Sequence, residues 1–158
     1  MSSEIEKYIE GYIEKYIISK QLCAVGESQV MTELDAQQAS LDQLTQKRNT
    51  IIRRFDSQED QSFPQLRMLY LHTYDALFRV IEIQLLQRYH VKLAHKPHRT
   101  MQDLLWMLFP TTHQTYTNEI MSMIVRTRHQ AKKQRQMPLL STYHLLLSLY
   151  DTCRQSVA

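Results

Sequence analysis

Residues 64–93 read PQLRMLYLHTYDALFRVIEIQLLQRYHVKL and form the longest apolar-rich stretch of the chain. Apolar side chains recur there at spacings of three and four residues, which indicates an α-helix, and they extend around much of its girth. A helix of that kind is normally buried. We therefore expect a central helix, capped at its start by Ser62 and closed near Pro97, against which every other segment packs.

The composition of the 158-residue chain favours a single all-α domain. The chain contains two glycines, four prolines and no alternating valine-rich segment, so helices are expected throughout. Because glycine is so scarce, the glycine-dependent motifs of P-loop, Rossmann and α/β-hydrolase sites are absent. We predict one domain over residues 1–158, a bundle of about six helices with a long N-terminal helical hairpin.

Charge is distributed unevenly along this chain. Residues 1–60 carry 11 acids and 7 bases, a balance of −4, whereas residues 61–158 carry 5 acids and 12 bases, a balance of +7; together they give +3. This division predicts an acidic amphipathic hairpin followed by a basic bundle. It also raises the hypothesis that the acidic part folds over the basic face as a competitor for its ligand.

The chain is expected to be soluble and cytoplasmic. It contains no apolar run of membrane-spanning length, and its N-terminus lacks the pattern of a signal peptide. Cys23 and Cys153 lie far apart in apolar surroundings, which suits reduced thiols. His90, His95 and His98 lie within nine residues, but no Cys, Asp or Glu accompanies them, so neither a metal site nor a cofactor is predicted.

Two amphipathic helices are expected before the central one. Residues 3–22 carry a stripe of isoleucine and tyrosine, and the glutamates of the opposite face argue against membrane attachment. In residues 28–55, apolar side chains follow a heptad interrupted by Gln37 and Arg48. That heptad suits either a hairpin with the first helix or a coiled coil between subunits. The predicted interface residues are Ile5, Tyr8, Tyr12, Leu34, Leu41 and Leu44.

Three further helices are expected after the central one. Thr100 and Asp103 resemble a capping box, and Pro110 ends the short helix that they open. The next helix covers residues 113–135, where Pro138 stops it, and the last begins at Ser141.

The tract RTRHQAKKQR, residues 126–135, contains five cations and a histidine without any acid. Such a group on about three turns of helix is typical of phosphate binding, and RNA or another nucleic acid is the predicted partner. The alternative is a solvated helix end whose cations interact favourably with the helix dipole. The predicted phosphate-binding residues are Arg126, Arg128, His129, Lys132, Lys133 and Arg135.

Arg67 and His72 form an Arg-x4-His pair on the central helix. A spacing of five residues separates them by about 140° around an α-helix, so they converge only on an irregular helix or across a dimer. A converged pair could stabilise a phosphorane and move a proton in metal-independent RNA cleavage. The alternative is a chance pairing that includes a half-buried histidine.

Three segments carry a family resemblance: HTYDALFRVIEIQLL (72–86), KPHRTMQDLL (96–105) and MIVRTRHQAKK (123–133), followed by an apolar closing helix. With these segments, residues 64–156 resemble the HEPN superfamily of small helical domains. The resemblance implies an up-and-down helical bundle, often a homodimer. It also implies a metal-independent RNase, or the partner of a small nucleotidyltransferase, in toxin–antitoxin and phage-defence systems.

The catalytic Arg-x4-6-His motif of that family belongs on the arginine-bearing helix. No histidine stands four to six residues beyond Arg126 or Arg128, and the pair of Arg67 and His72 lies on another helix. The resemblance therefore implies a copy that binds RNA, a nucleotide or a protein without cutting. The alternatives are a helical adaptor or small subunit of a larger assembly, and an RNase that uses Arg67 and His72 across a dimer.

Overall fold

The computed structural model describes residues 2–56, 63–94, 98–110, 112–133, 138 and 140–157. It has the predicted all-α character, with a small antiparallel ribbon that was not predicted. The ribbon pairs β1 (Leu22–Ala24) with β2 (Val91–Leu93). The helices are α1 (Ser2–Ile18), α2 (Glu27–Asp56), α3 (Phe63–Tyr89), α4 (His98–Leu108), α5 (Thr112–Thr115), α6 (Asn118–Lys132) and α7 (Leu140–Val157).

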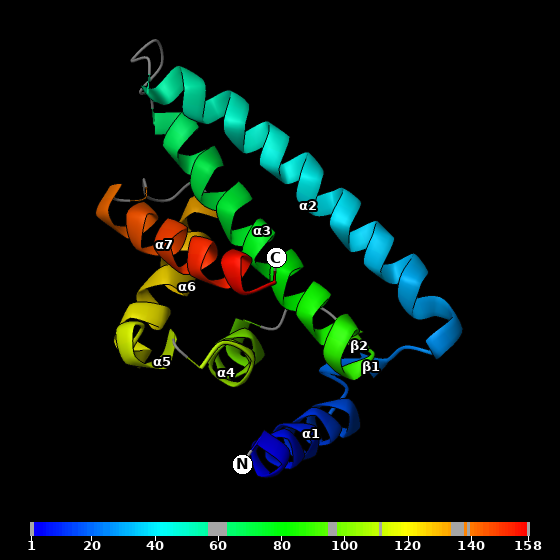
Figure 1. Cartoon of the computed structure of the whole chain (residues 1–158). Helices are drawn as coiled ribbons and strands as arrows, with labels where there is room; N and C mark the ends of the chain where they lie inside the picture. Colours follow the sequence, from blue (N-terminus) through cyan, green and yellow to red (C-terminus); the bar gives the residue numbers. More distant parts are fainter. Residues whose placement is uncertain are drawn as a thin grey trace.

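Helix α3 is the central element, as predicted. It runs between α2 on one side and α4, α6 and α7 on the other (Figure 1). Its side chains are buried around most of the girth, because both sides are covered. The fully buried large side chains of α3 include Leu69, Tyr70, Tyr74, Leu77, Phe78, Ile81, Leu85 and Leu86.

Helix α3 ends earlier than the pattern suggested. His90 adopts a left-handed conformation with φ 53°, and its N–H donates to the Leu86 carbonyl at 3.3 Å, which terminates the helix. Residues 91–93, which sequence analysis assigned to this helix, form β2 instead. The first helix, predicted over residues 3–22, likewise ends earlier, at Ile18, and Leu22 begins β1 instead.

A long helical hairpin is present, but its arms are α2 and α3 rather than the first two helices (Figure 1). Leu41 of the heptad is fully buried, and Leu34 and Leu44 are half-buried against the same core. Sequence analysis offered the first helix as the partner of this heptad within the chain. Helix α3 takes that place because its broad apolar girth buries more surface than the narrow stripe of α1.

Both polar interruptions of the heptad have specific contacts with another helix, Gln37 with α3 across the hairpin and Arg48 with α7. The Gln37 side-chain oxygen accepts a hydrogen bond from Arg79 Nη1 at 2.8 Å. Arg48 is only 6% exposed, and its guanidinium lies over the ring of Tyr150 in α7, 4.9 Å from the ring centroid. Polar residues at heptad positions that pair with particular partners fix the register of two helices.

Helix α1 packs at the far end of α3, against the ribbon and α4 (Figure 1). Ile9 and Ile13 are buried there, and the Tyr16 hydroxyl donates to Asp103 Oδ2 at 2.8 Å. The stripe predicted for the first helix therefore includes side chains that contribute to the core of this chain.

The later helices differ from the prediction at their ends. Helix α4 begins two residues before Thr100, and the predicted helix over residues 113–135 is divided into α5 and α6. Thr117 caps α6, because its side chain accepts from the Ile120 N–H at 3.3 Å. Ser62 and Pro97 lie outside the described residues. No described helix is long and apolar enough to cross a membrane.

Candidate nucleic-acid interface

Helix α6 buries apolar side chains on one face and exposes most of its basic residues on the opposite face. Met121, Ile124 and Ala131 are buried against the bundle. Arg126, His129 and Lys133, at spacings of three and four residues, share one outward face, and all three are exposed. Three predicted phosphate-binding side chains therefore point in one direction, and the exposed Lys132 lies on the flank of this face.

Arg128 occupies a different place from its neighbours. It is half-buried, with its guanidinium 5.4 Å from the ring centroid of Tyr74 in α3. This cation–π contact makes Arg128 part of the packing between α3 and α6. Its position four residues after the buried Ile124 is the sequence signal for this inward orientation. Arg135 lies outside the described residues.

Arg67 caps the end of α6 that carries the lysines. Its Nε donates to the Ala131 carbonyl at 2.6 Å, and its Nη2 lies 3.4 Å from the Lys132 carbonyl. The last carbonyls of a helix have no partner within the helix, so a cation that binds them stabilises the final turn. No pattern in the sequence indicates this role, because the contact joins residues that are 64 positions apart.

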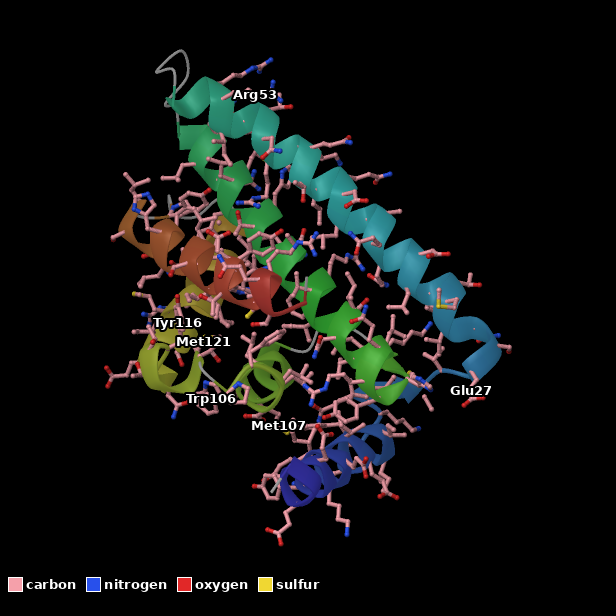
Figure 2. The ribbon with its side chains drawn as sticks, viewed as in Figure 1. Glu27, Arg53, Trp106, Met107, Tyr116 and Met121 are labelled. Atoms are coloured by element: carbon pink, nitrogen blue, oxygen red, sulfur yellow. The ribbon has the colours of Figure 1, made fainter. Side chains whose placement is uncertain are left out.

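A second pair of cations lies at the same end of α3. Because α2 runs antiparallel to α3, its C-terminal end lies beside the first turns of α3, where Figure 2 labels Arg53. Arg53 and Arg54 are both exposed there. The pattern of the sequence did not single them out, because acids follow them in the chain. We call the following set the basic end: Arg53, Arg54, Arg67, Arg126, His129, Lys132 and Lys133.

An acid limits the extent of the basic face along α6. Glu119 is exposed in the first turn and, with Asn118, Ser122 and Arg126, lines an open hollow of about 330 Å³. Positive charge is therefore concentrated in the second half of the helix, next to Arg67. Polyanion binding is expected on that half, because the Glu119 carboxylate repels phosphate.

The predicted catalytic pair engages two different helices. Arg67 reaches α6, whereas His72 lies next to Lys47 and Arg48 of α2. Burial, together with Lys47 and Arg48, lowers the pKa of His72, against an opposing effect of Asp75. Its Nδ1 is buried and lacks a hydrogen-bond partner within the described residues. This chain does not bring the two side chains together, so catalysis by them across a dimer stays a prediction.

The predicted interface residues fall into two groups. Leu34, Leu41 and Leu44 pack within the chain, between α2 and α3. Tyr8 and Tyr12 lie on α1 with their ring centroids 4.9 Å apart, and Tyr8 is 63% exposed. The side chain of Ile5 lies outside the described residues, and whether the tyrosines meet another subunit stays a prediction.

The three histidines considered for a metal lie near the end of α3 and the start of α4. His90 terminates α3, His98 begins α4, and His95 lies outside the described residues. Over the parts of the chain that the structure describes, no three His, Cys, Asp or Glu side chains form a cluster that could hold a metal ion.

Comparisons of the chain with protein-family models, with curated proteins and with solved structures find no match. The resemblance to the HEPN superfamily therefore stays a prediction from the sequence.

Proposed function

We propose that this chain is a HEPN-like helical binding module that engages RNA through its basic end and does not cut it. The observation that carries the proposal is the outward face shared by Arg126, His129 and Lys133, adjoining the turn that Arg67 caps. If the resemblance to the HEPN superfamily holds, the setting is a toxin–antitoxin or phage-defence system.

The geometry of the basic end suits a phosphate backbone better than a single small anion. Arg126 and Lys133 are seven residues apart, so they span about 10 Å along the helix axis. Exposed cations at that spacing contact successive charges of a chain, whereas one small anion needs donors that converge on a point. Contacts with about three to five phosphates would give a slope of about −2 to −4 in log affinity against log salt, at about 0.7 per contact for single strands.

Binding of the full-length chain to labelled single-stranded RNA, titrated with salt, tests the proposal. We expect the predicted slope, and we expect the K132E/K133E variant to lose affinity by about tenfold or more at low salt. The matched control is K7E/K15E, which makes the same change of charge on exposed positions of α1. Absent binding at low salt, or equal losses in the two variants, would contradict an RNA site at the basic end.

The same samples, run on a denaturing gel, test the catalytic alternative. Non-cutting binding is expected, because Arg67 and His72 engage different helices within the chain. Cleavage without added metal that disappears in H72A, at unchanged helical content, would instead favour a metal-independent RNase.

A helical adaptor is the second candidate function, and exposed apolar side chains favour it. Tyr8, Ile18 and Met31 are 63%, 76% and 66% exposed. Large apolar side chains on a surface are common at protein interfaces. Sedimentation over a range of concentrations tests this candidate: self-association that Y8S/I18S abolishes would support it, whereas a monomer at every concentration would count against a homodimer through α1.

A further inference from the structure

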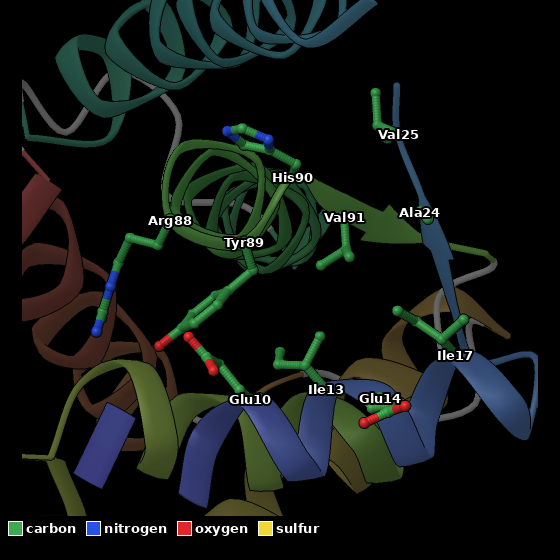
Figure 3. Close-up of a pocket in the computed structure, with 10 residues that line it drawn as sticks. All are labelled: Glu10, Ile13, Glu14, Ile17, Ala24, Val25, Arg88, Tyr89, His90 and Val91. Atoms are coloured by element: carbon green, nitrogen blue, oxygen red, sulfur yellow. The ribbon is translucent and has the colours of Figure 1, made fainter. Parts of the chain in front are cut away.

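A second hollow of the molecule lies at the C-terminal end of α3, away from the basic end. This cavity of about 480 Å³ is open to solvent and is lined by α1, by β1 and by the junction of α3 with β2 (Figure 3). Ligand pockets of proteins typically measure about 300–1,000 Å³, so the cavity can receive a small organic molecule.

Apolar side chains line the interior of this cavity. Ile13 of α1 and Val91 of β2 point toward one another from opposite sides, with Ile17 beside them (Figure 3). Val91 lies opposite Ala24 in the ribbon, and both residues line the cavity with Val25. These surfaces suit the hydrocarbon part of a ligand.

The polar part of the lining comes from two carboxylates of α1 and from Arg88, Tyr89 and His90 at the end of α3. Glu10 and Glu14 lie one helical turn apart on α1, both exposed, and both border the cavity. Glu6 already accepts from Arg88 Nη2 at 2.9 Å and from the Tyr89 hydroxyl at 3.3 Å. Among the residues that the structure describes, Glu10 and Glu14 form no ion pair.

The charge around the cavity is therefore negative. Glu6 neutralises Arg88 across the 2.9 Å ion pair, which leaves the charges of Glu10 and Glu14 without a counterion within the described residues. An anionic ligand would be repelled. A small hydrated metal ion would make no use of the apolar walls, whereas an organic cation with an aliphatic body complements both features.

We propose that this cavity binds an aliphatic diamine or polyamine. One ammonium group lies at Glu10 and the next at Glu14, whose Cβ atoms are about 5–6 Å apart because they are four residues apart on one helix. The methylene groups between them pack on Ile13, Val25 and Val91. This site is independent of RNA binding at the basic end and would remain if that function were disproved.

Isothermal titration calorimetry of the full-length chain at low salt, with putrescine and with spermidine, tests the proposal. We expect saturable binding of one molecule per chain, several-fold tighter for putrescine than for butylamine, which has only one ammonium group. E10Q/E14Q should weaken putrescine binding by several-fold or more. E4Q/E119Q, which removes two exposed carboxylates outside the cavity, should leave it unchanged.

A further variant tests the apolar walls separately from the charges. V25S keeps both carboxylates and should weaken putrescine about as much as butylamine, because both lose the same hydrocarbon contact. Thermal melting checks that each variant is folded.

Several results would overturn the proposal. They are the absence of saturable binding, equal affinity of E10Q/E14Q and the unsubstituted chain, and displacement of putrescine by an equimolar amount of Mg²⁺. Binding of a lysine-containing peptide without binding of any free diamine would also overturn it, because the occupant would then be a partner protein.

Discussion

At its N-terminal end α3 meets cations of α2 and α6, whereas at its C-terminal end it meets carboxylates of α1. At the N-terminal end, Arg67 donates to the last turn of α6, next to Lys132 and Lys133. At the other end, Arg88 is paired with Glu6. The 27 residues of α3 place these two environments about 40 Å apart.

The two ends of α3 therefore differ in charge, although the division does not follow the sequence strictly: Arg53 and Arg54 of α2 belong to the basic end, and Arg88 lies at the acidic end. The hypothesis that the acidic part folds over the basic face is wrong for α1, because α1 packs against the ribbon and α4. The two ends are therefore open to different ligands, and changes at one end should leave the other intact.

The largest loss of folding stability is expected for a substitution in the α2–α3 hairpin, because α3 separates the basic end from the acidic end. Replacing the fully buried Leu41 by alanine should lower the free energy of unfolding by about 2–5 kcal/mol, because it leaves a cavity between α2 and α3. Urea unfolding measures the loss. L140A, at a position that is 46% exposed, should cost under about 0.5 kcal/mol. A loss that depended on protein concentration would instead place Leu41 between subunits.

The next largest loss of folding stability is expected for a substitution of Arg67, at the basic end. The Arg67 guanidinium reaches two carbonyls, and the single ammonium group of R67K cannot reproduce that geometry. We expect a loss of about 1–2 kcal/mol, with faster amide hydrogen exchange at residues 131–133. R126K, which keeps the charge at an exposed position, is the control. Unchanged exchange in R67K would show that Arg67 does not stabilise this turn.

The helices could largely be predicted from the sequence because their apolar residues recur at helical spacing. The central position of α3 followed from its broad apolar girth, and the basic face followed from the acid-free tract of residues 126–135. The ribbon could not be predicted, because strands of three residues are too short to show alternation. Each strand also directly follows a helical pattern, which conceals it.

The contacts of the candidate site depend on tertiary structure. Nothing near Arg67 in the sequence indicates that it binds Ala131, since that contact exists only after α6 has packed on α3. The inward orientation of Arg128, by contrast, was predictable from helical phase, because it follows the buried Ile124 by four residues. The spacing of residues within one helix thus predicts which side chains share a face. Which other helix that face contacts depends on tertiary packing.

A smaller loss of folding stability is expected on acidification, through His72 in the α2–α3 hairpin. The folded state lowers the pKa of His72 below its ordinary value of 6.5, chiefly through burial and the nearby Lys47. The unfolded chain then binds more protons than the folded chain, so stability is complete above about pH 6.5 and declines below it. In urea unfolding at several pH values, H72Q should lose less stability on acidification. An identical decline in both proteins would contradict this role of His72.

The smallest change in stability is expected at the acidic end, in E6Q. The ion pair of Glu6 with Arg88 is partly exposed to solvent, so its loss should cost under about 1 kcal/mol. The clearer measurement is the titration of Tyr89, whose pKa is raised to about 12 by burial, with added effects of Glu6 and Glu10 and an opposing effect of Arg88. Removing the Glu6 charge leaves Arg88 to stabilise the tyrosinate, so this pKa should fall toward its ordinary value of 10.0.

Ultraviolet absorbance of tyrosinate, with Y89F subtracted to isolate the signal of Tyr89, follows that titration in E6Q and in the control E4Q. We expect a lower pKa in E6Q alone and an unchanged RNA affinity in both variants, because the basic end lies at the other end of α3. A change in RNA affinity in E6Q but not in E4Q would show that the two ends are coupled. An unchanged pKa of Tyr89 in E6Q would show that Glu6 does not contribute to raising it.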